Sequence, residues 1–195
     1  MDRKVSDVNI LNKFTEDFCS VVNKYARYVV VSGFVAISHG RSRGTENVDI
    51  MIEGLSFVEF KKMDDVLVEA GFECLYPLKV EDIYKHLTGK LNVRYSWKGV
   101  ELPNMEVKFA KDSLDDEQFE TRGKIEFTGV DVFFPKIEES IAFKEEYLGS
   151  EKDLEDAKHL RLIYMDKLDE GYIEDYKEKI RRVKEWGGVL TMSRL

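Results

Sequence analysis

The sequence predicts an α/β (α+β) fold, in which a mixed β-sheet is flanked by helices and followed by a helical C-terminal part. Short β-branched or alternating segments are interleaved with stretches of helical period up to residue 134, and from Pro135 onward only the helical period continues. No Pro/Gly/Ser-rich linker and no internal repeat interrupts the 195 residues. We therefore expect residues 1–134 to form an α/β core and residues 135–195 to form helices that pack on it, in a single compact unit.

The first part of the chain predicts two strands and two helices. Residues 6–26 place apolar side chains at helical spacing, which is typical of a helix that faces the core. Residues 28–32 form a β-branched run that predicts a buried strand, and a glycine then opens a short helix over 33–39. Residues 47–53 alternate in polarity, so we expect a second strand there.

The middle of the chain begins with a clear helix start. Ser56 opens a capping box, in which an N-cap hydroxyl pairs with a carboxylate at the third helical position, and it predicts a helix that runs to Gly71. Residues 91–97 and 104–109 alternate on either side of a turn that contains Gly99, so we expect adjacent antiparallel strands. The remaining segments are predicted as a strand at 72–75, a short helix at 80–88, a β segment at 124–134, and helices at 136–148, 151–167 and 170–186.

Composition and charge argue against several classes of protein. The formal net charge of −8 speaks against a dedicated nucleic-acid coat protein, although a local basic patch remains compatible with it. Cys19 and Cys74 lie far apart without CxxC spacing, so neither a disulfide framework nor a zinc knuckle is expected. No apolar run approaches the roughly 20 residues of a membrane span, and the first residues hold no apolar signal core. We expect a cytoplasmic protein without a membrane partner, and the sequence predicts no oligomeric state.

One segment, residues 28–52, has the pattern of a phosphate-handling site rather than of a scaffold. An apolar strand ends at Ser32-Gly33, a short helix follows, and a basic loop leads to a second strand that carries Asp49. Because side chains alternate along a strand, Asn47 and Asp49 point to the same face. Backbone amides at the start of the short helix are donors for phosphate oxygens. This order of residues predicts a site for a metal-bound phosphate.

Glu106 is the candidate for a third ligand of that metal. An acidic side chain on a strand next to Asp49 would complete a magnesium site. The alternative is that Glu106 pairs with Lys108, which shares its face, as an exposed cross-strand pair. Arg41 and Arg43 in the basic loop are candidates for neutralising phosphate charge, and their alternative is a pair of solvated loop charges.

These motifs resemble the polymerase-beta-type nucleotidyltransferase superfamily and, within it, the small prokaryotic AbiEii-type and minimal nucleotidyltransferases. Those proteins carry an h-G-[GS] turn, a short helix that often ends in H-G-R, and a T-x-D-h-D strand; this chain has VSGFVAISHGR followed by TENVD. Residues 129–163 are similar to a later block of the family, which has a strand, a proline, a helix with a lysine, and a K-D-x-x-D helix. The matching positions of that block are Lys144, Lys152, Asp153 and Asp156. We interpret the last three as intrahelical ion pairs rather than as site residues.

The resemblance implies an enzyme that depends on Mg²⁺ and transfers a nucleoside monophosphate from a nucleoside triphosphate to a hydroxyl of a protein or RNA acceptor. Asn47 and Asp49 would hold the nucleotide-bound metal, and Glu106 would hold a second metal and act as general base. The residues that would contact the phosphates are Ser32, Gly33, Arg41, Arg43 and Lys144. The resemblance also implies a toxin–antitoxin or phage-defence setting.

Three departures from the family pattern keep other functions open. Ser32 stands at the first glycine, Asn47 at the first aspartate of the T-x-D-h-D strand, and Glu106 at the third carboxylate, which is an aspartate in the family. A neutral amide removes one negative charge from a site built for two cations, so we expect either a two-ion site or an impaired one-ion site. The alternative function is a catalytically degenerate protein of the same fold that binds nucleotide, RNA or a protein partner without turnover. A third is a structural, antitoxin-like module that binds neither metal nor nucleotide.

Overall fold

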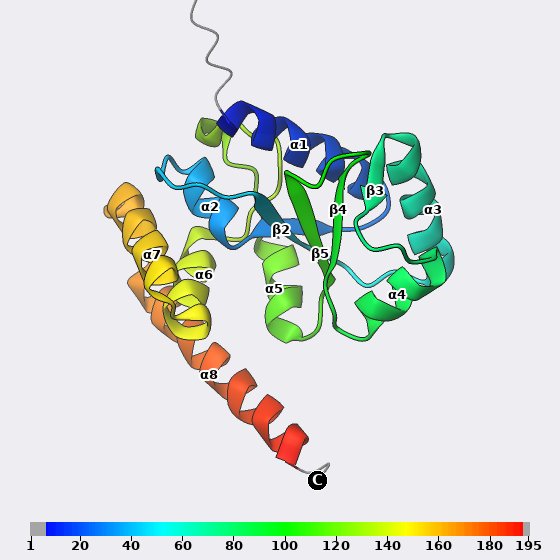
Figure 1. The fold of residues 1–195 in the computed structure, drawn as a ribbon. Coiled ribbons are helices and arrows are strands. Elements are labelled where there is room, and N and C mark those ends of the chain that lie inside the picture. Colours follow the sequence, from blue (N-terminus) through cyan, green and yellow to red (C-terminus); the bar gives the residue numbers. More distant parts are fainter. Residues whose placement is uncertain (1–6, 193–195) are drawn as a thin grey trace, which may run out of the picture.

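The computed structural model describes residues 7–192, and its centre is one five-stranded mixed sheet with helices packed around it (Figure 1). The strand order is β1-β2-β5-β4-β3, in which β2 and β5 run parallel and all other neighbours run antiparallel. The predicted α/β (α+β) fold class is therefore confirmed. The strands are β1 (Tyr28–Val31), β2 (Asn47–Ile52), β3 (Phe72–Cys74), β4 (Val93–Trp97) and β5 (Asn104–Phe109).

The pairing of the strands follows the local sequence in one part of the sheet and the overall topology in another. β4 and β5 pair as predicted, with Val93 opposite Val107, and Gly99 has a φ of 82° in the turn between them. Glycine adopts such a positive φ at little cost. The chain passes through β3 and β4 between β2 and β5, so the parallel pairing of β2 with β5 depends on the assembly of the whole sheet.

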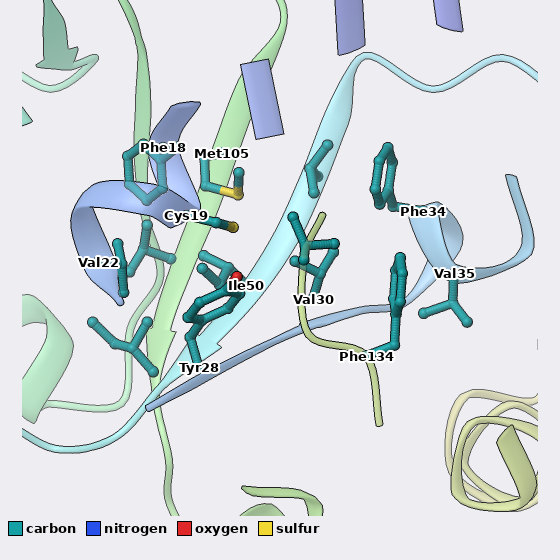
Figure 2. Close-up of a cluster of buried hydrophobic side chains, with 14 of the residues drawn as sticks. Phe18, Cys19, Val22, Tyr28, Val30, Phe34, Val35, Ile50, Met105 and Phe134 are labelled. Carbon is teal, nitrogen blue, oxygen red and sulfur yellow. The ribbon is translucent and has the colours of Figure 1, made fainter. Parts of the chain in front are cut away.

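Helices α1 (Asp7–Val22), α3 (Phe57–Glu69) and α4 (Val80–Thr88) cover the apolar face of the sheet. Phe18 of α1 packs there in one cluster with Ile50 of β2, and both side chains are fully buried (Figure 2). Removing such apolar surface from water contributes roughly 25 cal/mol per Å² and is the main stabilising term of the fold.

The boundaries of these helices agree with the sequence at the start of α3 and differ from it at the end of α1. The predicted capping box is confirmed, because the Ser56 hydroxyl accepts a hydrogen bond from the Glu59 amide and the Glu59 carboxylate accepts one from the Ser56 amide. Helix α1 stops at Val22, before the predicted end at residue 26. Residues 23–25 form a turn instead, which leads toward β1.

The opposite face of the sheet is only partly covered. Val29 and Met51 pack there against Phe119 of helix α5 (Ser113–Thr121), an element that the hydrophobic pattern does not predict. The helix is largely polar, so its apolar residues carry little periodic signal. Its start is fixed instead by Asp112, whose side chain accepts hydrogen bonds from two amides of the first turn.

Residues 124–134 do not form the expected strand, and this prediction is wrong. The segment contains a 3-10 turn at Glu126–Thr128, and Gly129 follows with a φ of 68°. This left-handed conformation interrupts an extended backbone. A single isolated β-bridge joins Gly123 to Phe134, so the segment does not form a continuous β-ladder with a neighbouring strand.

The C-terminal part is helical, as predicted. Helix α6 (Ile137–Ala142) continues into a π-helical stretch, η2 (Phe143–Leu148), and α7 (Glu151–Tyr164) and α8 (Glu170–Met192) follow. All six residues of α6 are buried, because α6 packs against both α7 and α8. The C-terminal half of α8 runs away from the sheet (Figure 1). Within residues 7–192, no helix has the length and apolar character needed to cross a membrane.

Candidate active site

A strained turn joins β1 to the short helix α2 (Gly33–Ser38). Ser32 has φ 59° and ψ −132°, a conformation that favours glycine, and holding another residue there costs on the order of 1–3 kcal/mol. The Arg43 guanidinium packs directly against Gly33, because an added Cβ would lie 1.8 Å from its Nη2. The turn therefore places Ser32, the start of α2 and the Arg43 guanidinium next to one another.

Asp49 and Glu106 lie side by side on the partly covered face of the sheet. The parallel pairing of β2 with β5 makes these two residues direct partners in the register, so their side chains leave the sheet on the same side. Asn47 lies on the same face, two residues earlier, opposite Asn104. The structure thus brings the three residues predicted as metal ligands onto one face, which we call the site face.

The half-buried Asp49 carboxyl lies in an environment that disfavours its charge. Burial raises the pKa of Asp49 above its usual range, and the negative charge of Glu106 raises it further. Lys108, the Ser32 hydroxyl and Lys144 act on this pKa in the opposite direction. A carboxyl group whose pKa is raised in this way gains from a bound cation, and such groups are common at functional sites.

Glu106 is held by two neighbours. Its Oε2 accepts hydrogen bonds from Arg94 Nε at 3.0 Å and Nη2 at 2.9 Å, and its Oε1 accepts one from Asn92 Nδ2 at 2.6 Å. Arg94 is its register partner on antiparallel β4, so the ion pair follows from the strand pairing. The expected alternative partner, Lys108, does not take this place: among the described residues, Lys108 forms no ion pair.

The site face offers two oxygen donors of the kind that a divalent cation takes. The Asp49 carboxylate and the Asn47 amide oxygen are hard oxygen ligands of the kind that Mg²⁺ takes. Both oxygens of Glu106 already accept hydrogen bonds, so a second cation would have to displace Arg94 and Asn92. In the described part of the chain, no group of three or more Asp, Glu, His or Cys side chains has an arrangement that could hold a metal ion.

The three basic residues predicted as phosphate ligands converge on Asp156 of α7. Nη1 of Arg41 lies 2.9 Å from its Oδ1, and Nζ of Lys144 and Nη2 of Arg43 lie 2.9 Å and 3.3 Å from its Oδ2. Asp156 is fully buried and its partners come from other elements, so its interpretation as an intrahelical ion pair is wrong. The other carboxylates that pair with these cations are Asp153 and Glu155.

No family model matches the chain, and no curated protein matches its sequence. Solved structures do match. The solution structure of the antibiotic-resistance factor ANT(2'')-Ia has a TM-score of 0.57 and 11% identity, over 95% of this chain and 98% of that chain. The crystal structure of ANT(2'')-Ia in complex with adenylyl-2''-tobramycin has a TM-score of 0.54 and 12% identity, over 90% and 99%. The chain has the nucleotidyltransferase fold. The narrower resemblance to AbiEii-type proteins stays a prediction.

In this nucleotidyltransferase fold, a hollow opens next to the Ser32 turn, between the site face, α5 and η2. Lys111, just after β5, donates a hydrogen bond from Nζ to the Tyr147 hydroxyl at 3.3 Å. The side chains that line the hollow include Ser32, Lys108, Lys111, Lys144, Phe143 and Tyr147. Three lysines and one carboxylate, that of Asp115, line the hollow, and this excess of positive charge suits an anion.

A second, more open groove of the nucleotidyltransferase fold borders Asn47. Asp49 is two residues from Asn47 and close enough to Ser32 and Lys108 for both to affect its pKa. Asn47 lines this groove, and Asp49 on the same face neighbours Ser32 and Lys108 of the lysine-lined hollow. The wall of the groove is lined by Ile37, Leu102, Pro103 and Lys152.

Several residues of the site are not predicted by the sequence. Lys108 could have been found, because it shares an alternating face with Glu106 and follows it by two residues. Arg94 and Asn92 become site residues only through the pairing of β4 with β5, and Asp156 only through the packing of α7 against the loop before β2. No local pattern marks Arg94 or Asn92, whereas Asp156 lies in the K-D-x-x-D segment, whose place in the site the sequence alone does not reveal.

Proposed function

We propose that this protein is a nucleotidyltransferase, which transfers a nucleoside monophosphate from a nucleoside triphosphate to an acceptor hydroxyl. The observation that supports this most is the pairing of Asp49 with Glu106 on parallel strands, directly beside the Ser32-Gly33 turn. The nucleotidyltransferase fold of the chain agrees with it. Adjacent carboxylates next to a phosphate-binding turn are what phosphoryl transfer needs, because the reaction depends on positioning and on charge stabilisation.

The lysine-lined hollow would bind the triphosphate. Lys108 forms no ion pair among the described residues, and Lys111 donates only to a tyrosine hydroxyl, so both have donors to offer to phosphate oxygens. Asp49 and Asn47 would hold one Mg²⁺, which supplies charge neutralisation to the phosphates when it is bound. Asp156 holds three further cations beside the Ser32-Gly33 turn, and these would add positive charge near the phosphates. They are Arg41, Arg43 and Lys144.

The acceptor would approach from the groove beside Asn47. Its hydroxyl oxygen bonds to the α-phosphorus, the bond from that phosphorus to the bridging oxygen of the β-phosphate breaks, and pyrophosphate leaves. The hydroxyl proton passes to the Glu106 carboxylate, which Arg94 and Asn92 hold in place. The family resemblance favours a protein or RNA acceptor in a toxin–antitoxin or phage-defence setting. The adenylylated aminoglycoside bound to ANT(2'')-Ia makes a small hydroxyl compound a further class to test.

A second function, nucleotide binding without turnover, is favoured by two features of the same site. Asn47 contributes no negative charge, and the Glu106 carboxylate is already neutralised by the Arg94 guanidinium. A site with less negative charge holds its metal more weakly, and a weakly held metal gives less stabilisation to the transition state.

The two functions are separated by label transfer from α-labelled nucleoside triphosphates in the presence of Mg²⁺. We expect the full chain to label itself, a protein, tRNA or an aminoglycoside, and Asp49→Ala to abolish the labelling. Asp65→Ala is the matched control, because Asp65 is an exposed aspartate that pairs with Lys61 on α3. If the parent transfers no label and Asn47→Asp does, the non-catalytic function is correct. Absence of both nucleotide and Mg²⁺ binding in calorimetry would exclude both functions.

A further inference from the structure

The pair formed by Arg94 and Glu106 has the geometry of a fixed part of the site. Two nitrogens of the guanidinium donate to a single oxygen, Oε2, at 3.0 Å and 2.9 Å. The other oxygen accepts from Asn92 at 2.6 Å. Hydrogen bonds to charged groups are stronger than neutral ones, and three of them restrain this carboxylate. Glu106 is therefore held through both of its oxygens.

The strand register keeps this pair in place. Arg94 and Glu106 are direct partners on β4 and β5, and Asn92 lies two residues before Arg94, next to the start of β4. The pair is not a buried structural one, because the side chain of Arg94 is 43% exposed and that of Glu106 is 20% exposed. It lies at the open surface of the site, where a bound metal would also have to lie.

The charges around Glu106 also oppose a cation there. A divalent ion at Glu106 would lie next to the Arg94 guanidinium, and like charges a few ångströms apart repel each other. Asp49 differs, because it forms no ion pair with an arginine or lysine among the described residues. The two carboxylates of the site therefore differ: Asp49 is available to bind a cation, and Glu106 is already paired with Arg94.

We propose that Arg94 takes the place of a second metal ion beside Glu106, so that the site binds a single divalent cation at Asp49 and Asn47. This inference rests on the proposed function and concerns the charge of the same site. Arg94 acts through Glu106 as a positioning residue: it neutralises that carboxylate and orients it toward the acceptor hydroxyl.

The test counts Mn²⁺ ions bound to the full chain by electron paramagnetic resonance, with and without a non-hydrolysable nucleoside triphosphate. We expect one ion for the parent. Arg94→Met frees Glu106, so this variant should bind a second ion. Its affinity for that ion should be at least tenfold higher than any affinity of the parent for a second ion. The double variant Arg94→Met, Glu106→Gln should return to one ion. Arg27→Met is the matched control, because Arg27 also pairs with a glutamate, Glu53, and has a similar exposed fraction of 39%; it should keep one ion.

A further variant keeps the test decisive if Arg94→Met fails to fold, as checked by circular dichroism. Glu106→Gln alone should still bind one ion, because Glu106 is not a ligand of that ion. The inference is overturned if the parent binds two ions or none, if folded Arg94→Met still binds one, or if Glu106→Gln loses the ion. The proposed function fails separately: a parent that binds one ion and the nucleotide but transfers no label contradicts the activity and leaves the inference intact.

Discussion

Burial and the charge of Glu106 disfavour the ionised form of Asp49, so its charge lowers the stability of the fold at neutral pH. Because its folded-state pKa is raised, the stabilisation that it gives to the folded state is complete below the unfolded-state pKa and is lost as the pH rises through the folded-state pKa. We expect Asp49→Asn to raise the free energy of unfolding at pH 7, and to raise it less at acidic pH. Urea denaturation at both pH values measures this difference.

The same substitution should reduce label transfer. Loss of the metal-binding carboxylate removes several kcal/mol of transition-state stabilisation, which corresponds to roughly 1,000-fold in rate. A gain in stability together with a loss of activity is the pattern of a functional residue. If Asp49→Asn is less stable than the parent at pH 7, the carboxylate is needed for the fold, and burial does not raise its pKa.

Asp156 is the opposite case, a buried charge on which the fold depends. Its carboxylate lies within 3.3 Å of Arg41, Arg43 and Lys144 and has no exposed surface. Removing one partner from such a group leaves buried cations without compensation and costs about 3–5 kcal/mol. We expect Asp156→Asn to lower the free energy of unfolding by this amount in urea denaturation.

Asp153 provides the control for that prediction. It lies one turn earlier on α7, 3.7 Å from Lys144, and is 22% exposed. We expect Asp153→Asn to cost no more than about 1 kcal/mol, as is usual for a more exposed ion pair. Equal effects of the two substitutions would contradict the central role of Asp156.

Among the elements, α5 depends on its N-cap more than on its apolar residues. The side chain of Asp112 accepts hydrogen bonds from the amides of Leu114 and Asp115. We expect Asp112→Ala to cost about 1 kcal/mol and to speed amide hydrogen exchange in the first turn of α5. Asp116→Ala is the control, because Asp116 is exposed in the same turn and its side chain does not cap the helix. Similar exchange in both variants would show that the cap does not hold the helix.

The elements that the sequence predicts correctly are those with a strong local signal. β1 and β2 show β-branched or alternating residues, and α3 shows a capping box. α5 lacks apolar periodicity, so no pattern predicts it. Residues 124–134 contain the residues of a strand, yet the left-handed Gly129 and the turn before it outweigh that propensity.

The features of the candidate site also differ in whether a local sequence pattern predicts them. The shared face of Asn47 and Asp49 follows from the alternation of side chains along one strand, which the sequence contains. The contact of Arg94 with Glu106 follows from the register between two strands, and the contact of Arg43 with Asp156 follows from tertiary packing. A local pattern holds no information on either contact, so both become visible only in the folded molecule.

At the scale of the whole molecule, the C-terminal helices and the sheet share one core. Ile141, Leu160 and Tyr176 belong to the same buried cluster as Val30 and Ile50, and all five are at most 1% exposed. Removing the helices would expose the apolar surface on the sheet side of this cluster. We therefore expect residues 1–134 alone not to fold, and the full chain to unfold in a single transition.

Two probes can test this single transition in urea. Trp97 of β4 packs edge-on against Phe14 of α1, with ring centroids 5.1 Å apart, so its fluorescence reports on the sheet and its apolar layer. Trp186→Phe removes the other tryptophan, and far-UV circular dichroism reports mainly on the helices, of which the C-terminal part contributes a large share. The two probes should give the same midpoint.

Separate midpoints, or native Trp97 fluorescence in the fragment 1–134, would mean that the sheet is stable without its helices. In that case Lys144 and Asp156 could detach from the Ser32 turn while Asp49 and Glu106 stayed paired on their strands. The phosphate side of the site would then depend on the docking of the helices, and label transfer would be lost at a lower urea concentration than Trp97 fluorescence.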